Sequence, residues 1–172
     1  MRSPEVLARF TSRSPAATRA LGAALGARLG PSQGLALSGE LGAGKTVLVR
    51  GLAEGLGVDE PGEVRSPTWL LMVEHPGPIP LLHLDAYFAD RGRDFLADGG
   101  QAYLQEGGVL AVEWADRLEL PLPEDFLEVE LAHLDEEERQ VVVRGRPDPW
   151  AARLAGLGQG IPDLEVMPLS DR

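Results

Sequence analysis

Residues 39–46, which read GELGAGKT, constrain the fold of this chain more than any other stretch. They match the pattern GxxxxGK[ST], they follow the apolar run QGLALS (33–38), and they open a segment with apolar residues at helical spacing (44–57). Glycines in such a loop let backbone N–H groups turn toward phosphate oxygens, and the N-terminus of the next helix adds partial positive charge. The stretch therefore predicts a strand, a phosphate-binding loop and a helix.

The lysine of this loop is unusual for the chain as a whole. Lys45 is the only lysine among the 16 Lys and Arg residues, and a compact ammonium suits a place between phosphates better than the bulky guanidinium fork. We expect Lys45 to neutralise the β and γ phosphates, and the Thr46 hydroxyl to bind Mg²⁺. The predicted nucleotide-binding loop comprises Glu40, Leu41, Gly42, Ala43, Gly44, Lys45, Thr46 and Val47.

Two carboxylates stand at the ends of apolar runs. Asp85 ends LLHLD and Glu113 ends VLAVE, so both are expected at the carboxyl edge of the sheet, where ligands bind in open α/β folds. One carboxylate could hold the metal while the other orients water, which predicts a metal set of Thr46, Asp85 and Glu113. The alternative is that each is only a charge at the end of a strand.

The segment RSPTW (65–69) supplies a further candidate. Pro67 keeps Ser66 extended, and Thr68 then stands at the start of a predicted strand. A threonine after the phosphate helix can sense the γ-phosphate or Mg²⁺, as switch loops do. The alternative is a β-branched residue that only begins a strand.

Aromatic and imidazole side chains are harder to assign. Trp114 follows Glu113 directly, and it could pack against the nucleotide base or belong to the core. The three histidines, His75, His83 and His133, have no metal-ligand spacing, so we interpret them as structural.

The remaining pattern predicts an α/β fold: a three-layer arrangement like that of P-loop NTPases, with a mixed, mostly parallel sheet and a C-terminal antiparallel hairpin. Ser14 is expected to cap a helix that starts at Pro15 and has Gly30 just past its end, and Gly51 and Gly55 suggest close packing of the 44–57 helix against the sheet. Strands are expected at 5–10 (an edge strand), 33–38, 68–75, 81–88, 109–114, 125–134 and 139–146, and short helices within 90–108.

We expect one domain over residues 1–172, with a core of about 14–146 and a tail, 147–172, of a short helix and coil. No apolar run approaches the ~18–20 residues that span a bilayer, and the N-terminal residues lack the apolar block of a signal peptide. We expect a cytoplasmic protein, as a monomer or in a hetero-complex.

The net charge of -11 disfavours direct binding of nucleic acid, and the absence of cysteine excludes disulfides and thiolate zinc sites.

A phosphate-binding loop occurs in several classes of nucleotide-using protein, and the other residues of the chain bear on three of them. A GTPase needs an Asn-Lys-x-Asp motif, which this chain cannot form because Lys45 is its only lysine. A small-molecule kinase remains possible, since Arg91 and Arg93 could serve on a lid. A nucleotide-driven module that acts on protein partners also fits, because the chain has little room for a substrate domain.

The motifs GELGAGKT, VRSPTW, LLHLDAYF and VEWADRL, in this order and spacing, resemble the TsaE family (also called YjeE) over about residues 14–134. The resemblance implies an ATPase, with ATP and Mg²⁺ as cofactors, that assists formation of threonylcarbamoyladenosine in tRNA. It implies that the chain acts on the TsaB–TsaD assembly, with little or no direct binding of tRNA.

The same resemblance implies roles for individual residues. Catalytic roles fall on Lys45, Thr68, Asp85 and Glu113, and a place near the nucleotide falls on Trp114. The chain departs from the family pattern at two positions: Val47 stands where a second threonine is usual, and Phe88 where an arginine usually follows the D-x-Y motif.

Overall fold

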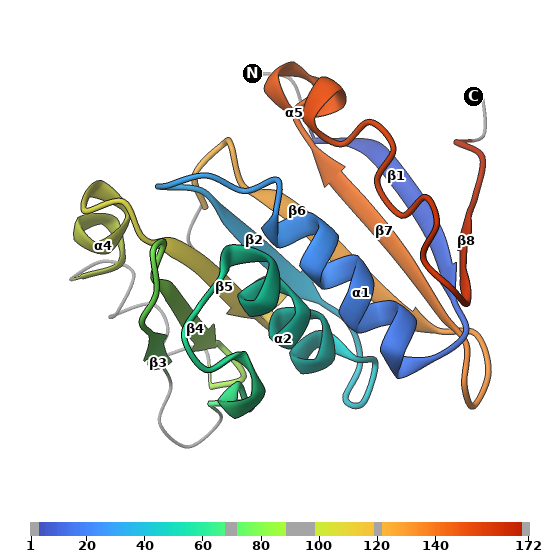
Figure 1. The fold of residues 1–172 in the computed structure, drawn as a ribbon, viewed down its shortest axis with the longest axis horizontal. Coiled ribbons are helices and arrows are strands. Elements are labelled where there is room, and N and C mark those ends of the chain that lie inside the picture. Colours follow the sequence, from blue (N-terminus) through green and yellow to red (C-terminus); the bar gives the residue numbers. More distant parts are fainter. Residues whose placement is uncertain (1–3, 68–71, 89–98, 119–121, 170–172) are drawn as a thin grey trace.

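The computed structural model describes residues 4–67, 72–88, 99–118 and 122–169, and eight strands and four α-helices lie in these ranges (Figure 1). In chain order the elements are β1 (Glu5–Ser12), α1 (Pro15–Gly26), β2 (Gly34–Ser38), α2 (Lys45–Leu56), η1 (Pro61–Glu63), β3 (Met72–His75), β4 (Leu81–Asp85), α4 (Gln101–Gln105), β5 (Val109–Glu113), η3 (Ala115–Arg117), β6 (Leu127–His133), β7 (Arg139–Gly145), α5 (Pro147–Arg153) and β8 (Leu164–Val166).

All of the described strands belong to one sheet, in the order β3-β4-β5-β2-β6-β7-β1-β8. The central strands β4, β5, β2 and β6 pair in parallel, and the outer pairings are antiparallel. The predicted mixed α/β sheet and the C-terminal hairpin are therefore confirmed. Parallel pairing is restricted to the central strands and does not form the majority of the pairings, because the hairpin, β1 and β8 extend one edge and β3 forms the other.

The central strands are buried along nearly their whole length because both faces of the sheet are covered there. On one face α1 and α2 lie side by side over the middle of the sheet, as Figure 1 shows. The opposite face carries α4 and a smaller apolar cluster around Leu84, Leu110 and Phe126. Toward β6 the cover on that face ends, and the strand alternates between buried and exposed residues.

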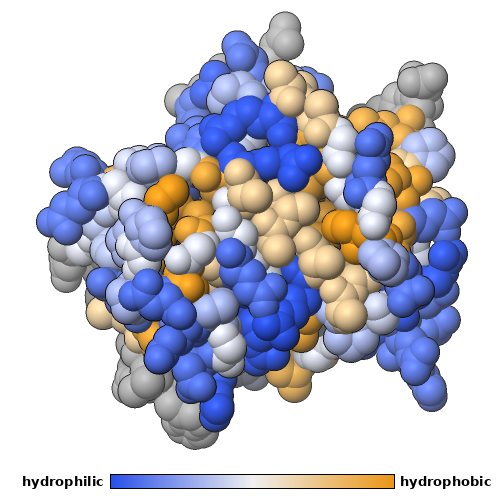
Figure 2. All heavy atoms as spheres, in the orientation of Figure 1, coloured by the Kyte–Doolittle hydropathy of each residue, from blue (hydrophilic) through white to orange (hydrophobic). Residues whose placement is uncertain are grey.

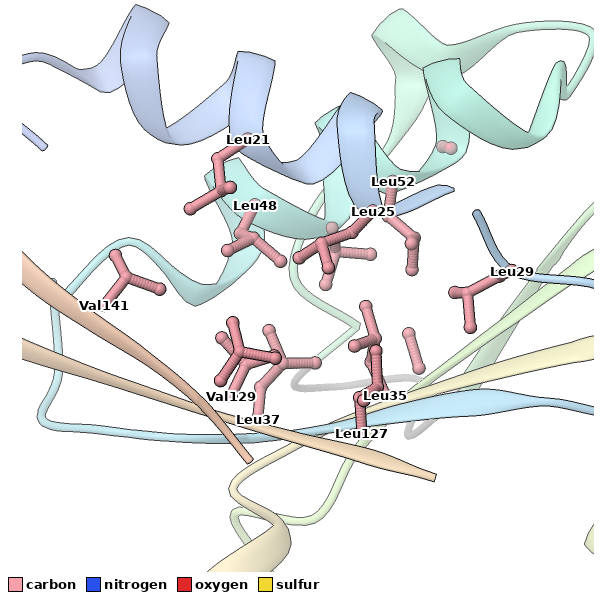
Figure 3. Packing of buried hydrophobic residues seen from close by; sticks show 14 of the residues in the cluster. Leu21, Leu25, Leu29, Leu35, Leu37, Leu48, Leu52, Leu127, Val129 and Val141 are labelled. Atoms are coloured by element: carbon pink, nitrogen blue, oxygen red, sulfur yellow. The ribbon is translucent and has the colours of Figure 1, made fainter. Parts of the chain in front are cut away.

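The main core lies between the two helices and the sheet. Figure 3 shows the side chains of α1 and α2 pointing toward those of the central strands. Burying each such side chain contributes about 1.5–3 kcal/mol to folding. The labelled members of this layer are Leu21, Leu25, Leu29, Leu35, Leu37, Leu48, Leu52, Leu127, Val129 and Val141.

The start of α1 follows its local sequence. Ser14 Oγ accepts a hydrogen bond from the backbone N–H of Ala17 at 3.1 Å, and Pro15 occupies the first turn. The predicted continuation of the helix to just before Gly30 is wrong, because α1 ends at Gly26. The chain turns there, and this turn allows Leu29 to enter the core.

Glycines hold α1 and α2 unusually close together. A Cβ at Gly51 would lie 1.8 Å from the carbonyl oxygen of Arg19, and one at Gly55 would lie 2.1 Å from that of Ala23. Gly22 and Gly26 of α1 face the backbone of α2 in the same way. The predicted close packing exists, but it is against α1 and not against the sheet.

The chain after β7 packs against the rest of the molecule. Trp150 of α5 is fully buried, and its indole Nε1–H donates to the carbonyl oxygen of Asp125 at 2.9 Å. The predicted short helix is confirmed. The predicted coil is corrected in part, because β8 pairs with Phe10–Ser12 of β1 and so moves β1 away from the edge of the sheet.

The helical face of the molecule has a mixed surface. Hydrophilic side chains cover most of its margins, and apolar atoms gather toward its middle, over the helices (Figure 2). Within the described ranges, no helix combines the length and the apolar character needed to cross a membrane.

Candidate functional site

The phosphate-binding loop connects the carboxyl end of β2 to the N-terminus of α2. Gly44 precedes α2 in a left-handed conformation, with φ of 104°, which favours glycine. Unlike α1, α2 has no side-chain cap at its N-terminus. The first turn of an α-helix has N–H groups without intrahelical partners, so these donors are available to a ligand in the loop.

Lys45 is folded back onto its own loop. Its Nζ donates to the carbonyl oxygens of Gly39 at 2.6 Å and Glu40 at 2.9 Å, and it lies 3.8 Å from the centroid of the Trp114 ring. Burial lowers the pKa of Lys45, and the carboxylate of Glu113 partly opposes this shift. Burying an ammonium without a full counter-charge is costly, so an anionic ligand would relieve this cost.

Asp85 and Glu113 lie side by side at the carboxyl edge of the sheet. They are register partners on the parallel strands β4 and β5, and each is only 2% exposed. Asp85 accepts hydrogen bonds from the Ser66 hydroxyl at 3.0 Å and from the backbone N–H of Tyr87 at 2.8 Å. The segment that contains Ser66 therefore reaches the same edge as the two carboxylates.

Glu113 links the sheet to the phosphate loop. Its Oε1 accepts a hydrogen bond from the Thr46 hydroxyl at 2.8 Å, and the same oxygen lies 2.7 Å from Nε2 of His83. The structural interpretation of His83 was therefore incomplete, because its ring contacts a candidate catalytic residue. The available signal was the H-x-D spacing, which places His83 and Asp85 on one face of β4.

The residues around this edge line a cleft of about 450 Å³. Of the predicted loop, Glu40 is exposed and lies outside the cleft lining, and Ala43 is buried and faces a neighbouring hollow. Thr68, Arg91 and Arg93 lie outside the described residues, so their predicted roles stay predictions. The cleft is lined by Leu41, Gly42, Gly44, Lys45, Thr46, Val47, Ser66, Asp85, Tyr87, Glu113 and Trp114.

Trp114 lines the cleft next to Lys45. Its backbone is left-handed, with φ of 59°, an uncommon conformation for a residue with a large side chain. The ring packs edge-on against Tyr87 at 5.2 Å between centroids, and the Arg117 guanidinium lies 4.7 Å from its centroid. Trp114 therefore contacts cationic and aromatic groups of the cleft while also packing against the smaller core cluster.

A second hollow of about 280 Å³ lies on the other side of the phosphate loop. The sequence did not reveal it, because residues from three distant segments form it. Arg13, Ser14, Pro15 and Thr18 come from the β1–α1 connection and the first turn of α1, and Glu136, Glu137 and Arg139 come from the β6–β7 turn and the start of β7. The two cavities share three lining residues, Gly42, Gly44 and Val47. Ala43 lines only the second hollow.

The donor set of the cleft fits a hard cation. Thr46, Asp85 and Glu113 offer a hydroxyl and two carboxylates, which are the oxygen ligands that Mg²⁺ prefers. Among the described residues, no group of three or more His, Cys, Asp or Glu side chains is arranged to hold a metal ion.

The fold and the site together define the class. A parallel strand, a glycine loop with the GxxxxGK[ST] pattern and an uncapped helix, beside carboxylates on two neighbouring strands, define an α/β protein with a P-loop NTPase-like architecture.

Comparisons with known proteins give the particular family. Residues 12–141 match the family described as "Threonylcarbamoyl adenosine biosynthesis protein TsaE". A protein of Streptomyces coelicolor described as "tRNA threonylcarbamoyladenosine biosynthesis protein TsaE" is 40% identical over 141 residues, covering 77% of this chain and 93% of its own length. One of the same description from Treponema pallidum is 36% identical over 135 residues, covering 78% and 98%. The crystal structure of Bacillus subtilis YdiB superposes with a TM-score of 0.71 at 28% identity, covering 92% of this chain and 98% of that one. The chain belongs to the TsaE family, as its motifs indicated.

Proposed function

We propose that this chain is a Mg²⁺-dependent ATPase that supports tRNA threonylcarbamoyladenosine biosynthesis by acting on a TsaB–TsaD assembly. One observation carries the ATPase proposal: Lys45, Thr46, Asp85 and Glu113 converge on one cleft at the carboxyl ends of β2, β4 and β5. Membership of the TsaE family supports the pathway. The partners come from the family resemblance.

Phosphate binding is the task of the loop and α2. The free N–H groups of the first turn of α2 would bind phosphate oxygens, and Lys45 would exchange the carbonyl oxygens of Gly39 and Glu40 for the β and γ phosphates. Thr46, Asp85 and Glu113 would hold Mg²⁺, directly or through water. Bound Mg²⁺ would neutralise charge on the phosphates.

Glu113 is the group best placed to act on the attacking water. Its side chain lies at the cleft, and its Oε1 is fixed by Thr46 and His83. The other oxygen is then available to orient a water molecule toward the γ-phosphate. Asp85, held by Ser66 and the backbone of Tyr87, would keep the metal side of the site in place.

The second hollow is our candidate for the site of the base and ribose. The catalytic carboxylates face the cleft, so the γ-phosphate belongs on that side of the loop. The base must then lie beyond the α-phosphate, toward Val47 and the start of α1. The hollow found there has Pro15, Ala43 and Val47 as apolar lining residues, which suits one face of a planar base.

The decisive experiment follows the labelled γ-phosphate of ATP. Release as free phosphate supports an ATPase, and transfer to a metabolite supports a small-molecule kinase. Lys45→Ala is expected to lose nucleotide binding, whereas Glu113→Gln is expected to bind ATP and lose hydrolysis. Normal hydrolysis by Glu113→Gln would refute the role of Glu113.

The proposal includes weak or no binding of tRNA by the isolated chain. A net charge of -11 makes the chain a poor partner for a phosphate backbone. Titration with labelled tRNA at physiological salt tests this, with the TsaB–TsaD assembly as a comparison. Tight binding by this chain alone would contradict it.

A further inference from the structure

His83 is a fully buried side chain that touches the reaction centre without lining the cleft. Its Nε2 lies 2.7 Å from Oε1 of Glu113, and its ring has no exposed surface. The residue stands on β4, and its register partner on β5 is Ala111. A methyl group at that position leaves space on the sheet face for an imidazole to reach Glu113.

The bonding pattern assigns the imidazole tautomer. The Thr46 hydroxyl donates to Glu113 Oε1, and the buried carboxylate gains a second donor if His83 carries its proton on Nε2. Within the described part of the chain, Nδ1 of His83 is buried without a hydrogen-bond partner. A bare Nδ1 lone pair fits such a place better than an N–H group, so the Nε2–H tautomer satisfies both ends of the ring.

The two donors to Glu113 differ in what else they do. Thr46 belongs to the phosphate loop and faces the cleft, and its hydroxyl is the group that we assign to Mg²⁺. His83 is embedded in the core side of β4 and has no such second task. The buried imidazole does not depend on the ligand in the cleft, so it fixes Glu113 whether or not the Thr46 hydroxyl also binds the metal.

We propose that His83 is a positioning residue: it holds Oε1 of Glu113 through its Nε2–H, so that Oε2 stays directed to the attacking water. The inference rests on the proposed role of Glu113 in ATP hydrolysis. His83 does not bind nucleotide, so its removal lowers kcat and leaves ATP affinity unchanged.

The test compares His83→Leu with His83→Gln. Leu fills the space without a donor, and the Gln amide places a donor near the position of Nε2. We expect His83→Leu to lower kcat by about tenfold to a hundredfold, the effect of losing one hydrogen bond to a charged group. We expect His83→Gln to recover most of this loss, with the Kd for ATP unchanged in both.

His75→Leu is the matched control, because His75 is another buried histidine of the same sheet, 6.4 Å from His83 between ring centroids. It shares the burial of His83 but does not contact Glu113 among the described residues, so its kcat should stay at the wild-type value. If His75→Leu and His83→Leu lower kcat equally, or if His83→Gln does not recover kcat, then His83 serves only in packing and the proposal is overturned.

An independent readout does not need hydrolysis. In ¹⁵N-labelled protein, the ring nitrogens of His83 should show a protonated Nε2 and a bare Nδ1, and the Nε2–H signal should move in Glu113→Gln. An Nδ1–H tautomer would refute the positioning contact even if ATP is hydrolysed. If the tautomer is as expected but the wild-type chain hydrolyses no ATP with or without partners, the proposed function fails and the contact stands.

Discussion

Replacing Gly51 with alanine tests how closely α1 and α2 approach each other. The added Cβ would lie 1.8 Å from the carbonyl oxygen of Arg19, which is 1.6 Å short of the 3.4 Å at which ordinary contact begins. The backbone of α2 fixes the position of the Cβ, and the oxygen belongs to the backbone of α1, so a rotamer change cannot relieve the clash. The helices must separate, and the leucine layer below them must open.

The expected magnitude combines two opposing effects. Overpacking costs about 1–3 kcal/mol, and a backbone clash this close belongs at the upper end of that range. Alanine in place of glycine within a helix stabilises the helix by about 1 kcal/mol. We expect a net loss of about 2 kcal/mol in the free energy of unfolding, which corresponds to a fall of about 1 M in the urea midpoint.

Two other glycines serve as controls in the same urea titration, followed by circular dichroism. Gly62 is exposed, and a Cβ there meets no atom within 4 Å, so Gly62→Ala should change the unfolding free energy by less than about 0.5 kcal/mol. Gly57 also has open space, but its φ is 75°, so Gly57→Ala should cost about 1 kcal/mol through backbone strain alone. If Gly51→Ala is as stable as Gly62→Ala, the close backbone contact does not exist.

Three further predictions concern other parts of the molecule. Burial, with a smaller contribution from His83, lowers the pKa of His75 below its ordinary 6.5. The unfolded chain therefore binds the proton more readily, and the free energy of unfolding falls as pH drops through 6.5 and below; His75→Leu should show a smaller fall between about pH 7.5 and about pH 5.5. Lys45 lies over the Trp114 ring, so ATP binding should change the tryptophan emission of the wild type, and a full response in Trp114→Phe would contradict this contact. Trp150 is fully buried, so Trp150→Ala should lower the free energy of unfolding by about 3–5 kcal/mol, and a change below about 1 kcal/mol would show that α5 does not pack as described.

Local chemistry made part of the fold predictable. The start of α1 depends on Ser14, Pro15 and a backbone group three positions away, all of which a reader of the sequence can see. The end of α1 is different, because Gly26 is required by contact with α2 and not by the end of the helix. The strand β8 has only three residues, and its pairing depends on β1 at the other end of the chain.

The same distinction applies to the site. Lys45, Asp85 and Glu113 were predicted to meet because each follows a motif or a strand end, and the structure places them on one cleft. The H-x-D spacing places His83 on the same strand face as Asp85, but its contact with Glu113 depends on the register of β4 against β5, which that spacing does not encode. The hollow beside the loop depends on the folding of the β6–β7 turn toward α1 and was likewise invisible in the sequence.

The glycine contact between α1 and α2 also determines which side of the nucleotide cleft is able to move. Packed elements usually change their arrangement when side chains at their interface repack. Where Gly22, Gly26, Gly51 and Gly55 set backbone against backbone, no such side chains lie between the helices. The wall of the cleft that α2 supplies is thus rigidly joined to α1, and a change of shape on nucleotide binding is expected on the opposite wall, beside Asp85. A partner that responds to the nucleotide state would have to bind that wall.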